Sequence, residues 1–295
     1  MLLVLLALSP LALAQDPQFE DFAKEEELKV EKPDADLSAE LGGVLTTGNA
    51  RFYNVGGGVK AGRKWTDNRL SGAAGLSITR AALDLNADAV LDSAEREQPV
   101  SDWALSAQLL TTQLRYDRFL GEKTSLYALA GADSNVLAGF RLRSHEQLGV
   151  SRGLVNEADL KLFTELGVDF AQEEYAPGSD LGQDGLDYVF PSARVMVGAE
   201  WVLNENVKVT EEIEVFENLL TVAGPGAEND LRLYNRAAMN VKLSDKMSLK
   251  LSHNVTFDNV PVLISDGGTP DDASDDERFA KLDQTTMVTF VASIF

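Results

Sequence analysis

The residues of this chain that could bind a cation lie in two acidic stretches. In Asp84–Glu95, four carboxylate residues and one amide residue place oxygen ligands at positions 1, 3, 5, 9 and 12 of a twelve-residue loop, the spacing of EF-hand calcium sites. Ala89 stands where the sharp turn of such a loop needs glycine. The second stretch, 266–277, carries five aspartates and Glu277. Both stretches also fit solvated loops, so calcium binding stays an alternative, and we predict no metal or cofactor site.

The two histidines, His145 and His253, are the candidate bases for nucleophilic catalysis. Each follows a serine directly, and neighbouring side chains on a strand face opposite ways, so neither Ser-His step forms a pair on one face. A cross-strand pair remains an alternative. We predict no catalytic residue, with His145 facing the interior of the fold and His253 incidental on an apolar face.

Charged residues of both signs recur at alternate positions, which places them on one face of the predicted strands. Two interpretations stay open: an interior cross-braced by salt bridges, in which buried charges are paired, or a narrow polar channel whose selectivity the charges tune. The predicted inward-facing charges are Lys60, Arg141, Arg143, Lys161, Glu165, Asp169, Arg194, Glu200, Lys208, Glu212, Glu214, Arg232, Arg236, Lys242 and Lys250.

The elements that carry these charges alternate between apolar and polar residues. In Met247–Asp258, odd positions are apolar except His253 and even positions are polar. This period of two indicates strands with one face in lipid and the other in a polar interior. About twelve such runs occur, at 37–47, 51–64, 69–82, 102–118, 123–132, 138–150, 157–173, 187–202, 206–218, 230–243, 246–262 and 279–295.

The connections between these runs fall into two kinds. Those after even-numbered strands are short turns centred on Asp67, Glu122, Asn156, Glu205 and Asp245. Of the others, 83–101, 174–186, 219–229 and 263–278 are long, and only the first, around 47–50, and the third, around 133–137, are short. Such sorting is typical of the periplasmic turns and extracellular loops of an outer-membrane barrel. The sequence therefore predicts an all-β fold: a transmembrane antiparallel up-and-down β-barrel of about twelve strands.

Composition excludes several other classes. No apolar run of the mature chain approaches the roughly 20 residues that a membrane helix needs, cysteine is absent, and a net charge of -21 argues against nucleic acid as a partner. The apolar start and the Ala12-Leu13-Ala14 site predict a signal peptide at 1–14. We expect a flexible acidic periplasmic stub at 15–36 and the barrel at 37–295.

Aromatic residues suggest two further features. Aromatic girdles at the membrane edges are expected to include Trp103, Tyr116, Tyr127, Tyr188, Trp201 and Tyr234. The last strand ends on Phe295, and we expect the barrel-assembly machinery to bind this strand through that residue.

Several segments resemble one Gram-negative outer-membrane family of unknown function, numbered 481 and also called YdiY-like or salt-induced outer-membrane protein. The similar segments are 41–49, 114–120, 140–143, 166–170, 257–261 and 281–283, and their order covers nearly the whole mature chain. The resemblance implies location and fold, but no reaction and no catalytic residue.

These features together predict a non-enzymatic protein of the cell outer membrane. It would act as a narrow passive channel or a structural envelope protein, related to stress, as a monomer in contact with outer-membrane lipid and lipopolysaccharide. A barrel enzyme acting on lipid or lipopolysaccharide is the alternative, and a soluble periplasmic β domain comes third.

Overall fold

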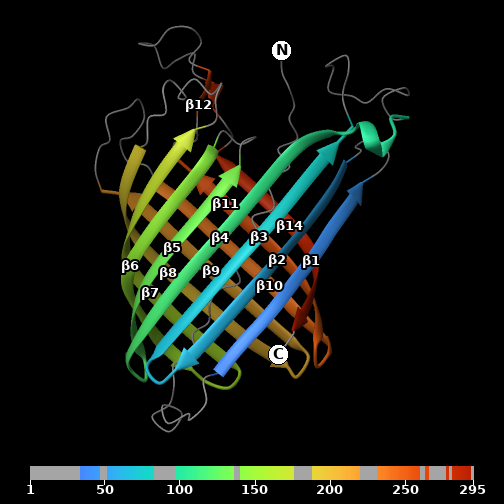
Figure 1. The fold of residues 1–295 in the computed structure, drawn as a ribbon. Helices are drawn as coiled ribbons and strands as arrows, with labels where there is room; N and C mark the ends of the chain where they lie inside the picture. The colour runs from blue at the N-terminus through green and yellow to red at the C-terminus, as the bar shows by residue number, and fades with distance from the viewer. Residues whose placement is uncertain are drawn as a thin grey trace.

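The protein is a closed antiparallel barrel of twelve strands (Figure 1). The computed structural model describes residues 34–46, 52–82, 97–135, 140–175, 188–219, 231–259, 263–265, 277–278 and 281–293. The barrel strands are β1 (Asp34–Thr46), β2 (Phe52–Trp65), β3 (Asn68–Ala81), β4 (Ala104–Gly121), β5 (Thr124–Asn135), β6 (Phe140–Asn156), β7 (Leu160–Tyr175), β8 (Tyr188–Asn204), β9 (Val207–Asn218), β10 (Leu231–Ser244), β11 (Met247–Asp258) and β14 (Leu282–Ser293). The predicted fold class and strand number are confirmed.

Each barrel strand pairs with its neighbours in sequence, and the first and last strands close the ring. β1 pairs with β2 over its whole length, from Asp34 to Thr46. Its pairing with β14 covers only Ser38–Gly42. This seam is the shortest pairing in the barrel, as far as the described residues show.

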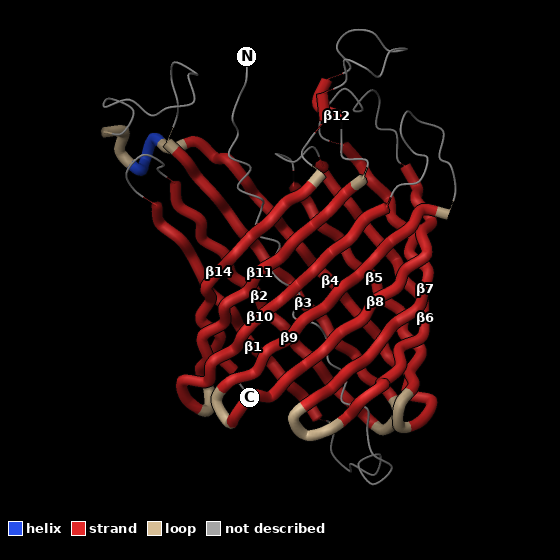
Figure 2. The backbone as a smooth tube through the Cα atoms, turned by 180° about the vertical axis from the view of Figure 1, so that it is seen from behind, coloured by secondary structure: helices blue, strands red, loops and turns tan. Residues whose placement is uncertain are grey.

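The short connections gather at one end of the barrel, which we call the turn end (Figures 1 and 2). The turn between β2 and β3 is tight enough to hold Thr66 at a positive φ of 49°, a left-handed conformation that few residues other than glycine adopt. Four of the five predicted turns lie where the sequence places them. The third falls at 157–159, because β6 runs on to Asn156 past a bulge between Gly153 and Val155.

At the opposite end, the loop end, two predicted connections contain short elements. Residues Val100–Asp102 form a single 3-10 turn before β4. Within the predicted loop 263–278, β12 (Leu263–Ser265) and β13 (Glu277–Arg278) pair as a separate two-stranded sheet beyond the barrel wall (Figure 1). No helix in the described ranges has the length and apolar character to cross a membrane.

Alternation decides which side chains face outward. Leu166 on β7 is 58% exposed on the outer surface, whereas its neighbour Glu165 is fully buried in the interior, which we call the lumen. The same holds for the exposed Leu251 and the buried Lys250 on β11. An apolar outer face around a polar lumen is the reverse of a soluble protein and the pattern of a membrane barrel. The register assigned from sequence to β11 is therefore confirmed.

This register predicts which single cysteines would react with which thiol probe. The natural chain contains no cysteine, so an introduced cysteine is the sole reactive thiol. Leu251→Cys is expected to react with a lipid-soluble thiol probe in reconstituted vesicles. Lys208→Cys, at a side chain that is 47% exposed inside the turn end, is expected to react with a water-soluble probe instead. Comparing the two labelling rates by mass spectrometry checks the register, and an exchange of the two preferences would contradict it.

The predicted aromatic girdle is only partly right. Tyr116 and Trp201 lie exposed on the outer surface, as expected, but Trp103 and Tyr127 are buried. Tyr127 faces the lumen because it shares the inward parity of the buried Ser125 and Leu129 on β5. Trp103 stacks on Tyr53, with ring centroids 5.9 Å apart. Tyr234 packs edge-on against the buried Phe216, and the side chain of Tyr188 lies outside the described residues.

Candidate functional site: the charged lumen

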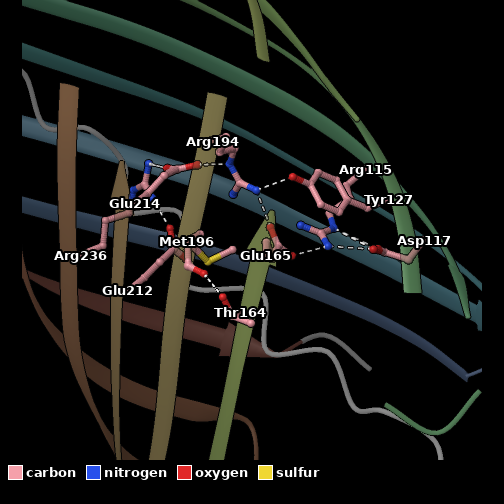
Figure 3. A network of polar contacts seen from close by, with 10 residues as sticks. All are labelled: Arg115, Asp117, Tyr127, Thr164, Glu165, Arg194, Met196, Glu212, Glu214 and Arg236. Atoms are coloured by element: carbon pink, nitrogen blue, oxygen red, sulfur yellow. Dashed lines mark hydrogen bonds and ion pairs between the residues drawn. The ribbon is translucent and has the colours of Figure 1, made fainter. Parts of the chain in front are cut away.

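The lumen contains a continuous chain of polar and charged side chains from six strands, β4, β5, β7, β8, β9 and β10, with β6 lying between β5 and β7 (Figure 3). Each member faces inward because it occupies the inward parity of its strand. We call this chain the lumen network. It consists of Arg115, Asp117, Tyr127, Glu165, Arg194, Glu212, Glu214 and Arg236.

Arg194 on β8 is the centre of the lumen network. Its Nη1 donates hydrogen bonds of 2.6 Å to Glu165 Oε2 and 2.6 Å to Tyr127 Oη. Its Nε donates to Glu214 Oε1 at 2.5 Å. One guanidinium thus contacts two carboxylates on the strands to either side, which is the forked geometry that arginine supplies and lysine does not.

Arg115 on β4 extends the lumen network on one side. Its Nη2 donates to Glu165 Oε1 at 2.6 Å, so that both oxygens of this carboxylate accept from arginine. Its Nε lies 3.0 Å from the carboxylate of Asp117, two residues along the same strand face. All of these side chains are almost completely buried, and such buried charges are tolerated because they are paired.

Arg236 on β10 extends the lumen network on the other side. Its Nη2 lies 2.8 Å from Glu214 Oε2, and its Nη1 contacts Glu212. Glu214 therefore joins Arg236 to Arg194, as Glu165 joins Arg194 to Arg115. Alternating basic and acidic groups leave no charge of the lumen network without an opposite neighbour.

Tyr127 is held between the lumen network and two glycines. Its ring lies 4.4 Å from the guanidinium carbon of Arg115, within the range of a cation–π contact. On its other side, a Cβ added at Gly149 would lie 2.6 Å from Tyr127 Oη, and one added at Gly167 would lie 2.5 Å from it. Both positions on β6 and β7 must therefore be glycine for the ring to lie across them.

Three smaller clusters hold other charges of the lumen. Glu173 contacts Arg143 at 2.8 Å and Arg232 at 3.6 Å. Glu200 contacts Lys208 at 3.1 Å and Lys161 at 3.7 Å. Glu40 contacts Lys60 at 2.9 Å and Lys250 at 3.4 Å. In each cluster one carboxylate is shared by two basic side chains.

Most of the predicted inward charges lie in the lumen as expected, but two lie near its ends. Arg141 is 60% exposed and pairs with Glu174, because a bulge between Phe140 and Leu142 disturbs the alternation there. Lys242 is exposed at the turn end and pairs with Asp245. The buried Asp169 faces the lumen as predicted.

Sequence reasoning missed four charges that form part of these clusters: Glu40, Arg115, Asp117 and Glu173. On β4 the apolar residues Leu109 and Phe119 also face the lumen. The inward positions of this strand therefore carry both apolar and charged residues, and hydropathy does not alternate clearly along it. The signal that could have found Arg115 and Asp117 is their spacing of two, with opposite charges on one face.

The histidines lie as predicted, on opposite sides of the wall. His145 faces the lumen over Gly131, where an added Cβ would lie within contact distance of its ring. His253 is on the outer wall, with Nδ1 2.8 Å from Thr286 Oγ1 on β14. The hydroxyl that His253 contacts across the strands is thus that of a threonine and not of a serine.

The two candidate calcium stretches lie almost wholly outside the part of the chain that the structure describes. Residues 84–95 lie outside the described residues, as does the stretch 266–277 apart from Glu277 in β13. Phe295, expected to be read by the assembly machinery, also lies outside them. Within the described ranges, no group of three or more His, Asp or Glu side chains could hold a metal ion.

The chain matches one protein-family model and is similar in fold to a number of solved structures. The family model described as "Protein of unknown function, DUF481" matches residues 39–270. One similar solved structure is the NanC porin, which is 10% identical with a TM-score of 0.46, over 88% of this chain and 100% of the porin. A second is an outer membrane channel from Pseudomonas putida F1, which is 12% identical with a TM-score of 0.45, over 92% of this chain and 100% of the channel. A third is the translocator domain of the autotransporter NalP from Neisseria meningitidis, which is 14% identical with a TM-score of 0.42, over 92% of this chain and 91% of that domain.

These structural likenesses concern the fold alone. No curated protein matches the chain. The family model covers most of the sequence, including every strand from β2 to β11. The chain belongs to the family of proteins of unknown function called DUF481.

Proposed function

We propose that this protein is a narrow passive channel of the bacterial outer membrane. The observation that carries the proposal is the lumen network: a closed barrel with an apolar outer face lines its interior with paired fixed charges of both signs. We further propose that the barrel works as a monomer, surrounded by outer-membrane lipid and lipopolysaccharide. The apolar side chains on its outer face, such as Leu166 and Phe290, support contact with acyl chains.

Charges fixed on the wall of a narrow passage act on any ion that passes them, since the surrounding protein screens them less than bulk water does. In the lumen network each arginine is balanced by carboxylates. We therefore expect small conductance steps with weak preference between cations and anions, since the lumen network presents little net charge and narrows the passage.

The test is planar-bilayer recording of the refolded protein. Replacing Glu165 and Glu214 by glutamine removes both carboxylates of Arg194 while keeping side-chain size. The reversal potential in a KCl gradient is expected to shift toward anion preference, with the cation-to-anion permeability ratio falling at least threefold.

Glu205→Gln, in the turn between β8 and β9, serves as the matched control and is expected to leave the ratio unchanged. If neither the natural chain nor the double variant carries current, the protein is a structural barrel and not a channel.

A further inference from the structure

The inner faces of β1, β2, β3 and β4 form a groove at mid-depth of the lumen. Its floor consists of residues with little or no side chain. Gly58 on β2 lies directly opposite Gly75 on β3, and Ala73 is the next inward residue of β3. All three lie near the middle of their strands, midway between the turn end and the loop end. The mid-lumen groove, as we call it, consists of Glu40, Gly58, Lys60, Ala73, Gly75, Thr111 and Gln113.

Polar side chains flank this floor on both sides. The strand register places Thr111 of β4 and Glu40 of β1 at the two ends of one row, with the two glycines between them. In the next row, Gln113 of β4 and Lys60 of β2 lie on either side of Ala73. The mid-lumen groove therefore has a bare floor and hydrogen-bonding groups at its edges.

A cavity of about 20 Å³ lies in the mid-lumen groove, lined by its seven residues together with Val59, Ala74 and Thr112. This volume holds about one water-sized group. Gln113 lines the cavity and is only 8% exposed, yet its amide makes no hydrogen bond to any described residue. A buried amide without a partner is costly. The missing partner is therefore expected to bind in this cavity.

The charges of the mid-lumen groove are already paired. Lys60 Nζ lies 2.9 Å from Glu40 Oε1, and Lys250 Nζ lies 3.4 Å from Glu40 Oε2. Both lysines make further interactions. An ion that bound here would have to displace these contacts, whereas a hydroxyl group would not. A hydroxyl can also accept a hydrogen bond from the amide of Gln113 and donate one to it. The chemistry of the cavity thus favours a neutral hydroxyl group.

We propose that the mid-lumen groove binds a small neutral polyol, with one of its hydroxyl groups in the cavity and hydrogen-bonded to Gln113. This proposal rests on the channel function proposed above and names the class of its solute. Gln113 and Arg115 are consecutive inward residues of β4, so the mid-lumen groove borders the lumen network. A polyol that crosses the barrel passes both.

Saturation-transfer NMR tests the binding, with sorbitol as the probe and the refolded full chain in micelles of a detergent that carries no sugar. Irradiating the methyl groups of the barrel is expected to attenuate the sorbitol signals. Gln113→Leu removes the amide and is expected to lower this transfer at least threefold. Gln172→Leu makes the same replacement at an exposed position of β7 and is expected to leave the transfer unchanged. Heat-modifiable migration on a gel identifies the folded barrel in each sample.

A second variant fills the floor without removing a polar group. Ala73→Leu is expected to lower the sorbitol transfer at least threefold as well, so either variant decides if the other fails to fold. Acetate serves as a charged probe without a hydroxyl group, and it is expected to show no transfer that depends on Gln113.

Three results would overturn the proposal. Absence of transfer to sorbitol in the natural chain would mean that the cavity holds water only. Transfer that persists in the folded variants would assign the binding to another place. Acetate transfer that Gln113→Leu abolishes would identify an anion site instead. The NMR measurement needs no current, so this proposal can fail in a barrel that conducts and can stand in one that does not.

Discussion

Arg194→Ala is expected to lower the free energy of unfolding by about 3–5 kcal/mol, because removing one partner of a buried ionic cluster leaves the others uncompensated. The side chain donates to Glu165, Glu214 and Tyr127 at 2.5–2.6 Å. Without the guanidinium, Glu165 on β7 keeps only its contact with Arg115, and Glu214 on β9 keeps only its contact with Arg236. The positive group that lay between the two carboxylates is lost. Urea unfolding of the barrel in detergent, followed by the heat-modifiable band, measures the change.

Arg118→Ala is the matched control, since it also removes an arginine that pairs with a carboxylate. Its partner is Asp67, and the Arg118 side chain is 48% exposed. Exposed pairs contribute about 0–1 kcal/mol, so this variant is expected to unfold nearly as the natural chain does. Equal losses for the two variants would show that burial of the lumen network does not contribute to stability.

Gly149→Ala is expected to impair the barrel nearly as strongly, by about 3 kcal/mol. The added Cβ would overlap the carbonyl oxygen of Leu166 and lie 2.6 Å from Tyr127 Oη. The tyrosine could move at the expense of its bond from Arg194, but the carbonyl belongs to the backbone of β7. Relief therefore requires the β6–β7 pairing itself to shift. The measured quantity is the yield of folded protein after dilution from urea.

Gly56→Ala provides the comparison on the other side of the lumen. There the nearest atoms to an added Cβ are Leu76 O at 3.4 Å and Ser77 Cβ at 3.5 Å, which are ordinary contacts. We expect this variant to fold like the natural chain. A Gly149→Ala barrel that folded equally well would show that Tyr127 is not held by close approach to β6.

The fold could be predicted from sequence because a membrane barrel must alternate along every strand. Leu251 and Lys250 are adjacent in sequence and face lipid and lumen, so hydropathy alone fixes the side to which each belongs. The prediction was wrong where that rule is relaxed. A bulge moved Arg141 to an exposed position, and Tyr127 was assigned to a girdle because aromatic residues suit the membrane edge as well as a lumen with glycines opposite.

The candidate site was less predictable than the fold, because ion pairs between strands depend on register. Glu165 and Arg194 are far apart in sequence, and their contact requires β7 and β8 to pair with Glu165 opposite Met196. A shift of two residues would keep every side chain on its predicted face and still break the contact. Parity therefore indicates which charges enter the lumen, whereas only the assembled barrel shows which of them meet.

The short seam between β1 and β14 bears on how the barrel forms. It joins the first and last strands of the ring, so nearly the whole chain must be ordered before this pairing can begin. Bringing the two ends together costs conformational entropy, and the contacts of this seam offset that cost only once the ring has closed. Until closure, both strands present unpaired edges of the kind that attach to foreign strands. Because only Ser38–Gly42 of β1 pairs with β14 in the part of the chain that the structure describes, ring closure is expected to be the last and most reversible step of folding. It is also the stage at which an unfinished chain is expected to be most prone to aggregate.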